Sequence, residues 1–188
     1  MKRAYTQTRR AAAAAETRRR IVEATVALHR EVGPRATTVT GIAERAGVDR
    51  VTVYKHFPEE ADLVAGCQAH WLSLHPPPDL AGLAGIADPE ARLSAALGAL
   101  WDWYARTREM TAHVLRDGPA LASFAEVLAG MRAQRMALAE ALAAGRAPHP
   151  GLLPALMLAT DFRTWEVLVH EGGLDHETAL ALVVGWPP

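Results

Sequence analysis

The stretch IAERAGVDRVTVYKHF, residues 42–57, places two short apolar patterns on either side of a single glycine. Gly47 can adopt the left-handed backbone conformation that a tight turn between two helices requires. Asp49 can cap the helix that follows, in which Val53 and Phe57 lie four residues apart on one side. We therefore expect two short helices joined by a turn, with one face of the second helix directed outward.

The outward face of this second helix is rich in hydrogen-bond donors. Its side chains are Arg50, Val51, Thr52, Tyr54, Lys55 and His56. A helix with its side chains fits the major groove of duplex DNA, where such donors reach base edges and phosphates. The pattern predicts a helix-turn-helix, whose first helix braces the second in the groove. Spacing alone leaves open an αα-hairpin whose polar face only meets water.

The same residues resemble those of a known protein family. Residues 38–48 read TVTGIAERAGV and residues 53–57 read VYKHF, which is similar to the amino-terminal signature of the TetR family of one-component transcriptional regulators. The resemblance extends over about residues 19–63. It implies that the DNA contacts are made by Thr38, Thr40, Arg50, Val51, Thr52, Tyr54, Lys55 and His56.

Within that set, the resemblance implies phosphate contacts for Tyr54 and His56 and base readout for the more variable positions. The family commonly has a lysine at the start of its fourth helix, whereas this chain has Glu60. An acid there favours the helix dipole but repels phosphate. We therefore expect DNA affinity to depend more on the arginine-rich N-terminal arm, which could reach the adjacent groove.

Charge is distributed unevenly along the 188 residues. Residues 1–60 hold twelve Lys or Arg against seven Asp or Glu, a balance of +5, and the remaining residues hold eight against fourteen, a balance of −6. A basic N-terminal part, residues 1–60, joined to an acidic remainder favours a polyanionic partner for the N-terminal part. An arginine-rich segment that is only solvated remains an alternative.

Composition and periodicity predict an all-α protein of about nine helices. Half of the residues are hydrophobic and only 6% are aromatic, and alternating strand patterns are nearly absent. We expect a flexible basic arm at residues 1–15 and a three-helix helix-turn-helix DNA-binding domain at residues 16–62. A helical ligand-binding and dimerisation domain, which the resemblance implies, would occupy residues 63–188.

Five helices are expected late in the chain, and one of them is a long helix after Asp117-Gly118-Pro119 that carries Phe124, Leu128 and Met131 on one face and ends near Gly145. Asp88-Pro89-Glu90 predicts the start of one that reaches about Tyr104, and a shorter helix is expected at about 108–116. A helix at about 150–170 has two apolar faces, and an apolar final helix begins near Leu174. Both need covering surfaces, and the family plan implies that the last two helices pair with their copies in a homodimer. Burial within one chain remains the alternative.

The resemblance also implies a cavity in the body for an unknown small-molecule effector. Ligand cavities are mostly apolar with a few polar groups. Residues of that kind in the body are Trp101, Tyr104, His113, Phe124, Met131, Asp161 and Trp165. Each can equally be an ordinary core residue, because aromatic and Met stripes at helical spacing discriminate poorly.

Several function classes are disfavoured. No nucleophile, base or metal-ligand spacing forms a catalytic set, so we predict that the chain is not an enzyme and needs no metal or cofactor. The single Cys67 cannot form an internal disulfide, which favours a reducing cytoplasmic location. Apolar stretches are far shorter than the roughly 20 residues of a membrane span, so no membrane partner is expected.

The combined expectation is a homodimeric, ligand-responsive DNA-binding regulator. We expect it to act as a repressor that a small molecule releases from a palindromic double-stranded DNA operator. Two alternatives belong to other classes. One is a helical adaptor that binds another protein through its last helices, and the other is a small helical enzyme whose basic N-terminal part is incidental.

Overall fold

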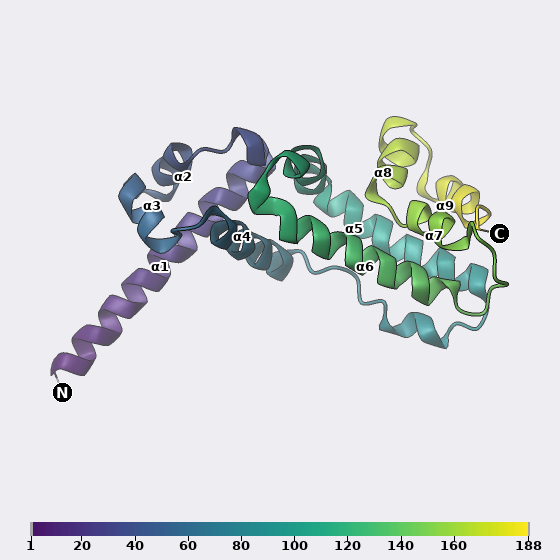
Figure 1. Ribbon diagram of the computed structural model, residues 1–188, viewed down its shortest axis with the longest axis horizontal. Coiled ribbons are helices and arrows are strands. Elements are labelled where there is room, and N and C mark those ends of the chain that lie inside the picture. Colours follow the sequence, from purple (N-terminus) through teal and green to yellow (C-terminus); the bar gives the residue numbers. More distant parts are fainter. Residues whose placement is uncertain (1, 188) are drawn as a thin grey trace. The chain divides into compact units, whose positions relative to one another are not determined.

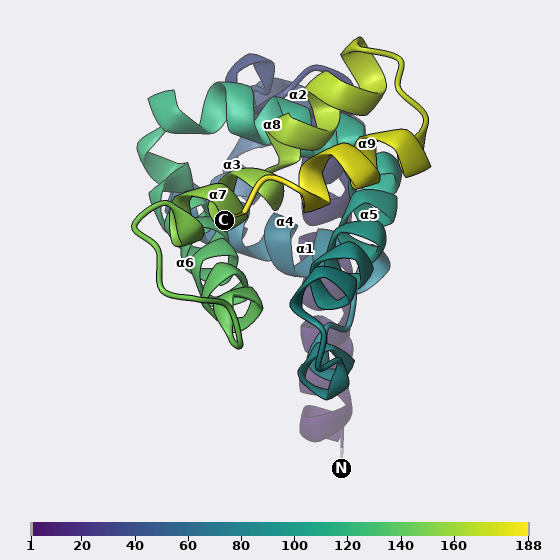
Figure 2. The same ribbon diagram turned by 90° about the vertical axis from the view of Figure 1, so that its right-hand side faces the viewer.

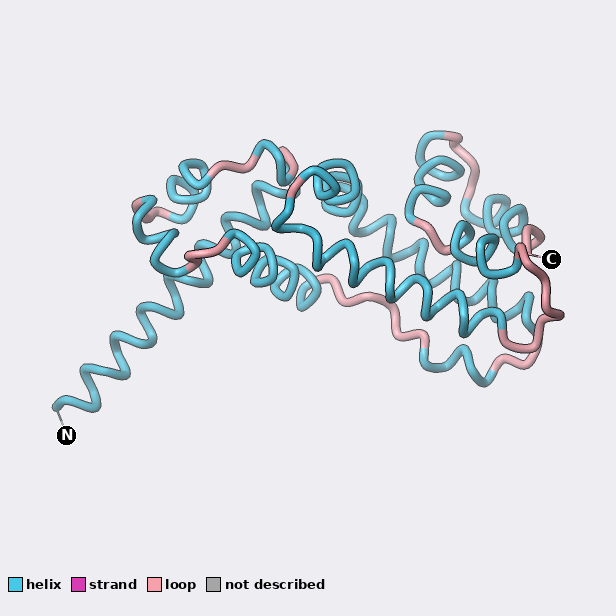
Figure 3. Tube along the Cα trace, viewed as in Figure 1, coloured by secondary structure: helices cyan, strands magenta, loops and turns pink. Residues whose placement is uncertain are grey.

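The computed structural model describes residues 2–187, and within that range the chain is helical without strands (Figure 1, Figure 3). The α-helices are α1 Lys2–Glu31, α2 Val39–Ala46, α3 Arg50–His56, α4 Glu60–Leu74, α5 Pro89–Asp117, α6 Ala125–Ala143, α7 Leu152–Ala159, α8 Phe162–Trp165 and α9 His176–Val184. The predicted all-α class is confirmed. Among the described residues, no helix is both long enough and apolar enough to cross a membrane.

The chain divides into two compact units. The first unit runs from the N-terminus to Pro76 and includes Ala112–Leu128, and the second unit consists of Pro77–Thr111 and Ala129–Pro188. This geometric division differs from the functional boundary predicted at residues 62 and 63. The whole of α4 stays with the first unit because Leu63, Val64 and Cys67 are buried.

The first unit is built around the second half of α1. Ile21 and Thr25 of this helix are almost completely buried, 0% and 1% exposed, and α1 packs against both α2 and α4. The Thr25 hydroxyl donates to the Ile21 carbonyl at 2.8 Å, which satisfies it inside the core. The buried apolar residues contributed by the other three helices are Ile42, Ala43, Ala46, Val53, Leu63, Val64 and Cys67.

The N-terminal segment is helical. We expected residues 1–15 to be a flexible arm, yet α1 is continuous from Lys2; Met1 lies outside the described residues. The physical reason is the run Ala11–Ala15, because alanine has the highest helix propensity of any residue. Residues 9–16 are all exposed, so this part of the helix has no covering surface in the first unit.

The fifth helix is also longer than expected. We predicted one helix ending near Tyr104 and a second at about 108–116, but α5 runs unbroken from Pro89 to Asp117. Its start is as predicted, since the Asp88 carboxylate accepts from the Ala91 backbone N–H at 2.9 Å. The intervening residues contain no glycine or proline, so nothing terminates the helix.

The helix predicted at about 150–170 is broken, which corrects that expectation. α7 ends at Ala159, and α8 begins after Asp161. Two adjacent polar side chains bond to the backbone at the break: the Thr160 hydroxyl donates to the Leu156 carbonyl at 2.8 Å, and Asp161 accepts from the Arg163 N–H at 2.8 Å. Such local bonds compete with helix continuation. A π-helical turn, Glu166–Glu171, follows α8.

The core of the second unit lies between α5 and the segments that follow. Leu93, Leu97 and Trp101 of α5 are 0% exposed. Arg92, one residue before this stripe, is itself buried and donates to the carbonyls of Ile86, Leu142 and Ala144. It thereby satisfies the backbone at the end of α6. Figure 2 shows α7, α8 and α9 grouped together in this unit.

Candidate nucleic-acid interface and effector-site residues

Local side-chain chemistry sets the geometry of the helix-turn-helix. The Thr38 hydroxyl caps α2 by accepting from the Gly41 N–H at 3.1 Å, and Asp49 caps α3 by accepting from the Thr52 N–H at 2.6 Å. Gly47 ends α2 in the left-handed conformation, with φ 64° and ψ 42°. The Val48 N–H closes the turn on the Ala43 carbonyl at 3.0 Å. The predicted turn at Gly47 and the predicted Asp49 cap of the second helix are confirmed.

The two faces of α3 differ sharply in exposure. Val53 and the following Phe57 are 2% and 3% exposed and pack inward. On the opposite side Val51 is 75% exposed and Tyr54 50% exposed. Arg50, Lys55, Thr38 and Thr40 are also exposed, whereas Thr52 and His56 are half-buried. The structure therefore brings all eight predicted DNA-contacting residues to the surface of one module.

Two arginine side chains of α1 contact the end of α3 and the turn that precedes this helix. The Arg18 guanidinium donates to the His56 carbonyl at 2.8 Å and lies over the Phe57 ring at 3.9 Å. Arg20 donates to the Gly47 carbonyl at 3.3 Å. Sequence reasoning missed this bracing role, because the partners lie 38 and 27 residues away and no local pattern indicates them.

A third arginine joins α2 to the end of α1. The two terminal nitrogens of Arg45 contact the two carboxylate oxygens of Glu31 at 2.5 and 2.7 Å. The pairing with this guanidinium lowers the pKa of the Glu31 carboxyl. In contrast, Arg50 and Lys55 of α3 have no protein partner among the described residues. Their charges are therefore available to a ligand.

Glu60 lies where the resemblance would place a phosphate-binding lysine. It is the first residue of α4 and is exposed. Asp62 follows in the same turn, so the start of this helix carries two acids. Both favour the positive end of the helix dipole. The phosphate contact that the resemblance implies at this position is therefore not expected of Glu60.

The seven predicted effector-site residues fall in both units. His113 and Phe124 belong to the first unit, where they contact His29 of α1. The rings of His29 and Phe124 are 5.7 Å apart, and His113 Nδ1 lies 3.1 Å from the His29 carbonyl. The residues placed in the second unit are Trp101, Tyr104, Met131, Asp161 and Trp165.

Two residues of the second group meet in an aromatic cluster. Tyr104 packs edge-on against Phe162, with ring centroids 5.3 Å apart at 88°, and its ring lies 6.2 Å from Trp165. All three side chains are buried. Burial, together with the nearby charge of Asp161, raises the pKa of the Tyr104 hydroxyl above its ordinary value. Tyr104 is therefore a neutral hydrogen-bond donor.

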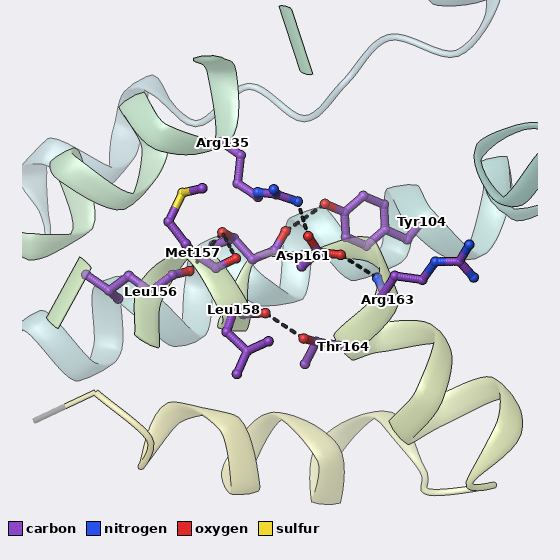
Figure 4. A network of polar contacts seen from close by, with 9 residues as sticks. Tyr104, Arg135, Leu156, Met157, Leu158, Asp161, Arg163 and Thr164 are labelled. Carbon is purple, nitrogen blue, oxygen red and sulfur yellow. Dashed lines mark hydrogen bonds and ion pairs between the residues drawn. The ribbon is translucent and has the colours of Figure 1, made fainter. Parts of the chain in front are cut away.

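A polar network adjoins this cluster at the break between α7 and α8 (Figure 4). The Tyr104 hydroxyl donates to the Thr160 carbonyl at 2.8 Å, and the Thr164 hydroxyl donates to the Leu158 carbonyl at 2.6 Å. Asp161 forms an ion pair with Arg135 of α6. Sequence reasoning found Tyr104 and Asp161 but missed Arg135, which is 26 residues from its partner.

Trp101 and Met131 stand apart from this network. Trp101 is fully buried, with its ring 5.6 Å from that of His176, and Met131 is half-buried on α6. One hollow of about 470 Å³ in the second unit is lined by Ser94, His176, Glu177, Leu180, Ala181 and Val184. None of the predicted effector residues lines it, so their assignment stays a prediction. No metal-binding group of three or more His, Cys, Asp or Glu occurs among the described residues.

Residues 21–67 match the family model of bacterial regulatory proteins, tetR family, which confirms the resemblance inferred for about residues 19–63. No curated protein matches the chain.

Two solved structures share the fold. One is a transcriptional regulator from Rhodococcus sp. Rha1, with 22% identity, a TM-score of 0.61 and coverage of 89% of this chain and 94% of that one. The other is a Clostridium perfringens protein provisionally described as a fatty acid metabolism regulator. It has 14% identity, a TM-score of 0.61 and coverage of 88% of this chain and 94% of that one.

Proposed function

We propose that this chain, which over residues 21–67 belongs to the TetR family of bacterial regulatory proteins, is a transcriptional regulator that binds duplex DNA through α3. The observation that carries the proposal is the exposed face of α3. Its donors point outward from a helix that is capped by Asp49 and braced by Arg18. A rigid helix of this polarity suits the major groove, where Arg50 and Lys55 can reach base edges and Tyr54 can reach phosphate.

The same proposal includes a homodimer that reads a palindromic operator. Recognition helices that bind successive half-sites on one duplex lie about 34 to 36 Å apart. Support comes from large apolar residues that are exposed in the single chain at its C-terminal end. They are Leu153 at 37%, Leu158 at 56%, Val167 at 52%, Leu182 at 49% and Trp186 at 37%. An interaction surface between two copies of the chain would bury such exposed apolar side chains.

The proposed regulator is a repressor that releases its operator when a small molecule binds the body. Support comes from composition: the buried aromatic cluster around Tyr104, next to the ion pair of Arg135 and Asp161, combines apolar rings with few polar groups, as effector sites do. Release requires that the effector bind the non-operator conformation more tightly. The coupling in such systems is typically about 1 to 3 kcal/mol.

DNA binding is tested by selecting bound duplexes from a random pool and measuring affinity for the selected sequence at fixed salt. We expect Lys55→Ala and Tyr54→Ala each to weaken binding, because each removes a direct contact worth about 1 to 3 kcal/mol. Arg106→Ala, an exposed base of α5 in the second unit, is the matched control and should bind normally. Unchanged affinity in both α3 variants, with folding intact, would refute the assignment.

Dimerisation is tested by sedimentation of the full chain. We expect a dimer that Leu158→Glu converts to monomer, because this side chain is 56% exposed on α7 and a charge cannot be buried there without a partner. Leu74→Glu, equally exposed at 59% on α4, should leave the dimer intact. A wild-type monomer would contradict the homodimer and favour the helical adaptor instead.

A further inference from the structure

The N-terminal part of α1 has no role in the core of the first unit. Among residues 9–31, whose exposure is described, the first fully buried one is Ile21, and the turns of α1 from Lys2 to Arg20, the N-terminal extension, are about 28 Å long at 1.5 Å per residue. Every residue from Arg9 to Glu16 is exposed. A helix segment of this length is not needed to hold α2, α3 and α4 together.

The extension leaves the module beside the recognition helix. Arg18 bonds to the carbonyl of His56, the last residue of α3, and its guanidinium lies on Phe57. Because this contact fixes α1 against the carboxyl end of α3, the turns before Arg18 continue past that end. Figure 1 shows the purple N-terminal half of α1 projecting beyond α3. The extension therefore lies beyond the carboxyl end of the proposed recognition helix.

The chemistry of the extension fits a polyanion. Residues 2–20 contain seven Lys or Arg and a single acid, Glu16. That acid is already neutralised by Arg19, whose nitrogen lies 2.6 Å from its carboxylate. The only apolar side chains between residues 9 and 20 are alanines, which offer too little area to dock on an apolar partner. Basic charge without apolar surface selects a phosphate backbone.

Helical geometry assigns different faces to the two arginines nearest the alanine run. At 100° per residue, Arg10 lies about 80° around the helix from Arg18 and about 12 Å along it, on the half of α1 that faces α3. Arg9 lies about 180° from Arg18, on the opposite half. Among the described residues Arg10 has no protein partner. Ala11, Ala14 and Ala15 share the face of Arg18 and present no steric obstacle to a neighbouring backbone.

We propose that residues 9–20 of α1 form a second DNA-contacting element, a basic helix that lies against the phosphate backbone outside the half-site read by α3, with Arg10 as a contact. The inference rests on the proposed function, because it requires α3 to occupy a groove. It gives the basic arm of the sequence prediction a helical form whose direction is set by Arg18. It also adds a backbone contact to an interface in which Glu60 provides none.

The test uses the full chain and the duplex selected above, extended by about ten base pairs at each end, which adds about one turn. Hydroxyl-radical footprinting should show protection of the backbone outside each half-site. Arg10→Gln should remove that protection and reduce the slope of log affinity against log salt by about 0.9 for each lost phosphate contact. Arg9→Gln carries the same charge change on the opposite face and is the matched control.

A second variant separates a rigid helix from a flexible basic tail. Ala13→Pro keeps every charge but breaks the extension, since an interior proline costs a helix about 3 kcal/mol. We expect it to lose the outer protection while the half-site footprint remains. Outer protection that persists in Ala13→Pro, or equal effects of Arg9→Gln and Arg10→Gln, would overturn the inference.

The two proposals fail in different ways. If Lys55→Ala weakens binding and the extension variants have no effect on footprint or salt slope, only the extension is wrong. If the chain binds no duplex from the pool, both proposals are refuted.

Discussion

His29 should make the first unit sensitive to mild acid. The side chain lies on α1, is 7% exposed, and its ring is 5.7 Å from that of Phe124. Burial lowers its pKa from 6.5 to about 4, against a small opposing effect of the Asp117 charge. His29 is therefore neutral in the folded protein, and the unfolded chain binds a proton that the folded chain does not.

The magnitude follows from proton linkage. Above pH 6.5, His29 is neutral in both the folded and the unfolded state, so its protonation does not lower the free energy of unfolding. As the pH falls from 6.5 towards 4, only the unfolded state is protonated, so stability decreases. With these two values the loss is about 2 kcal/mol at pH 5 and about 3 kcal/mol below pH 4. The pKa of the neighbouring Asp117 is lowered to about 2, chiefly by its bond with Arg116. The stability that the ionised Asp117 contributes is therefore lost only when the pH falls below 3.8, the ordinary pKa of this group.

The assay is urea unfolding at pH 7.5 and pH 5.0 at one protein concentration. Between these pH values the wild type should lose about 2 kcal/mol more than His29→Gln, which cannot titrate. His170→Gln, at an exposed position, should behave like the wild type. An identical pH dependence of His29→Gln and wild type would refute the reasoning. A direct check is the His29 ring resonance, which should not titrate above pH 5 in the folded protein.

Three further results are expected. Gly47→Ala should cost about 1 kcal/mol because φ is 64° there, whereas Gly130→Ala inside α6 should be neutral or stabilising, both measured by urea unfolding. Cys67 is 5% exposed and burial raises its pKa to about 12, so iodoacetamide at pH 8 should label it only after unfolding. Asp161→Ala should lower the free energy of unfolding by about 1 to 2 kcal/mol through loss of the α8 cap, and Asp161→Asn by less. Rapid labelling of Cys67 in the folded protein would contradict the second expectation. Equal losses of stability for Gly47→Ala and Gly130→Ala, or for Asp161→Ala and Asp161→Asn, would contradict the other two.

The parts of the fold that sequence predicted correctly are those where neighbouring residues decide the structure. Gly47 and Asp49 each act within three or four residues of their partners, so the turn and the start of α3 could be inferred directly. Apolar spacing also identified Val53 and Phe57 as inward-facing. Longer helices were less well predicted. Only the absence of a breaker between Tyr104 and the next predicted helix marks α5 as continuous.

The residues of the candidate interface were predictable from the sequence, but the contacts that hold them in place were not. By itself, the sequence determined a capped helix-turn-helix with donors on one face, because caps, turns and helical periodicity act over a few residues. Only the tertiary structure decided that Arg18 and Arg20 brace this helix, that His29 is buried, and that Arg135 pairs with Asp161. These contacts join residues tens of positions apart. Their energies depend on packing that no short segment specifies.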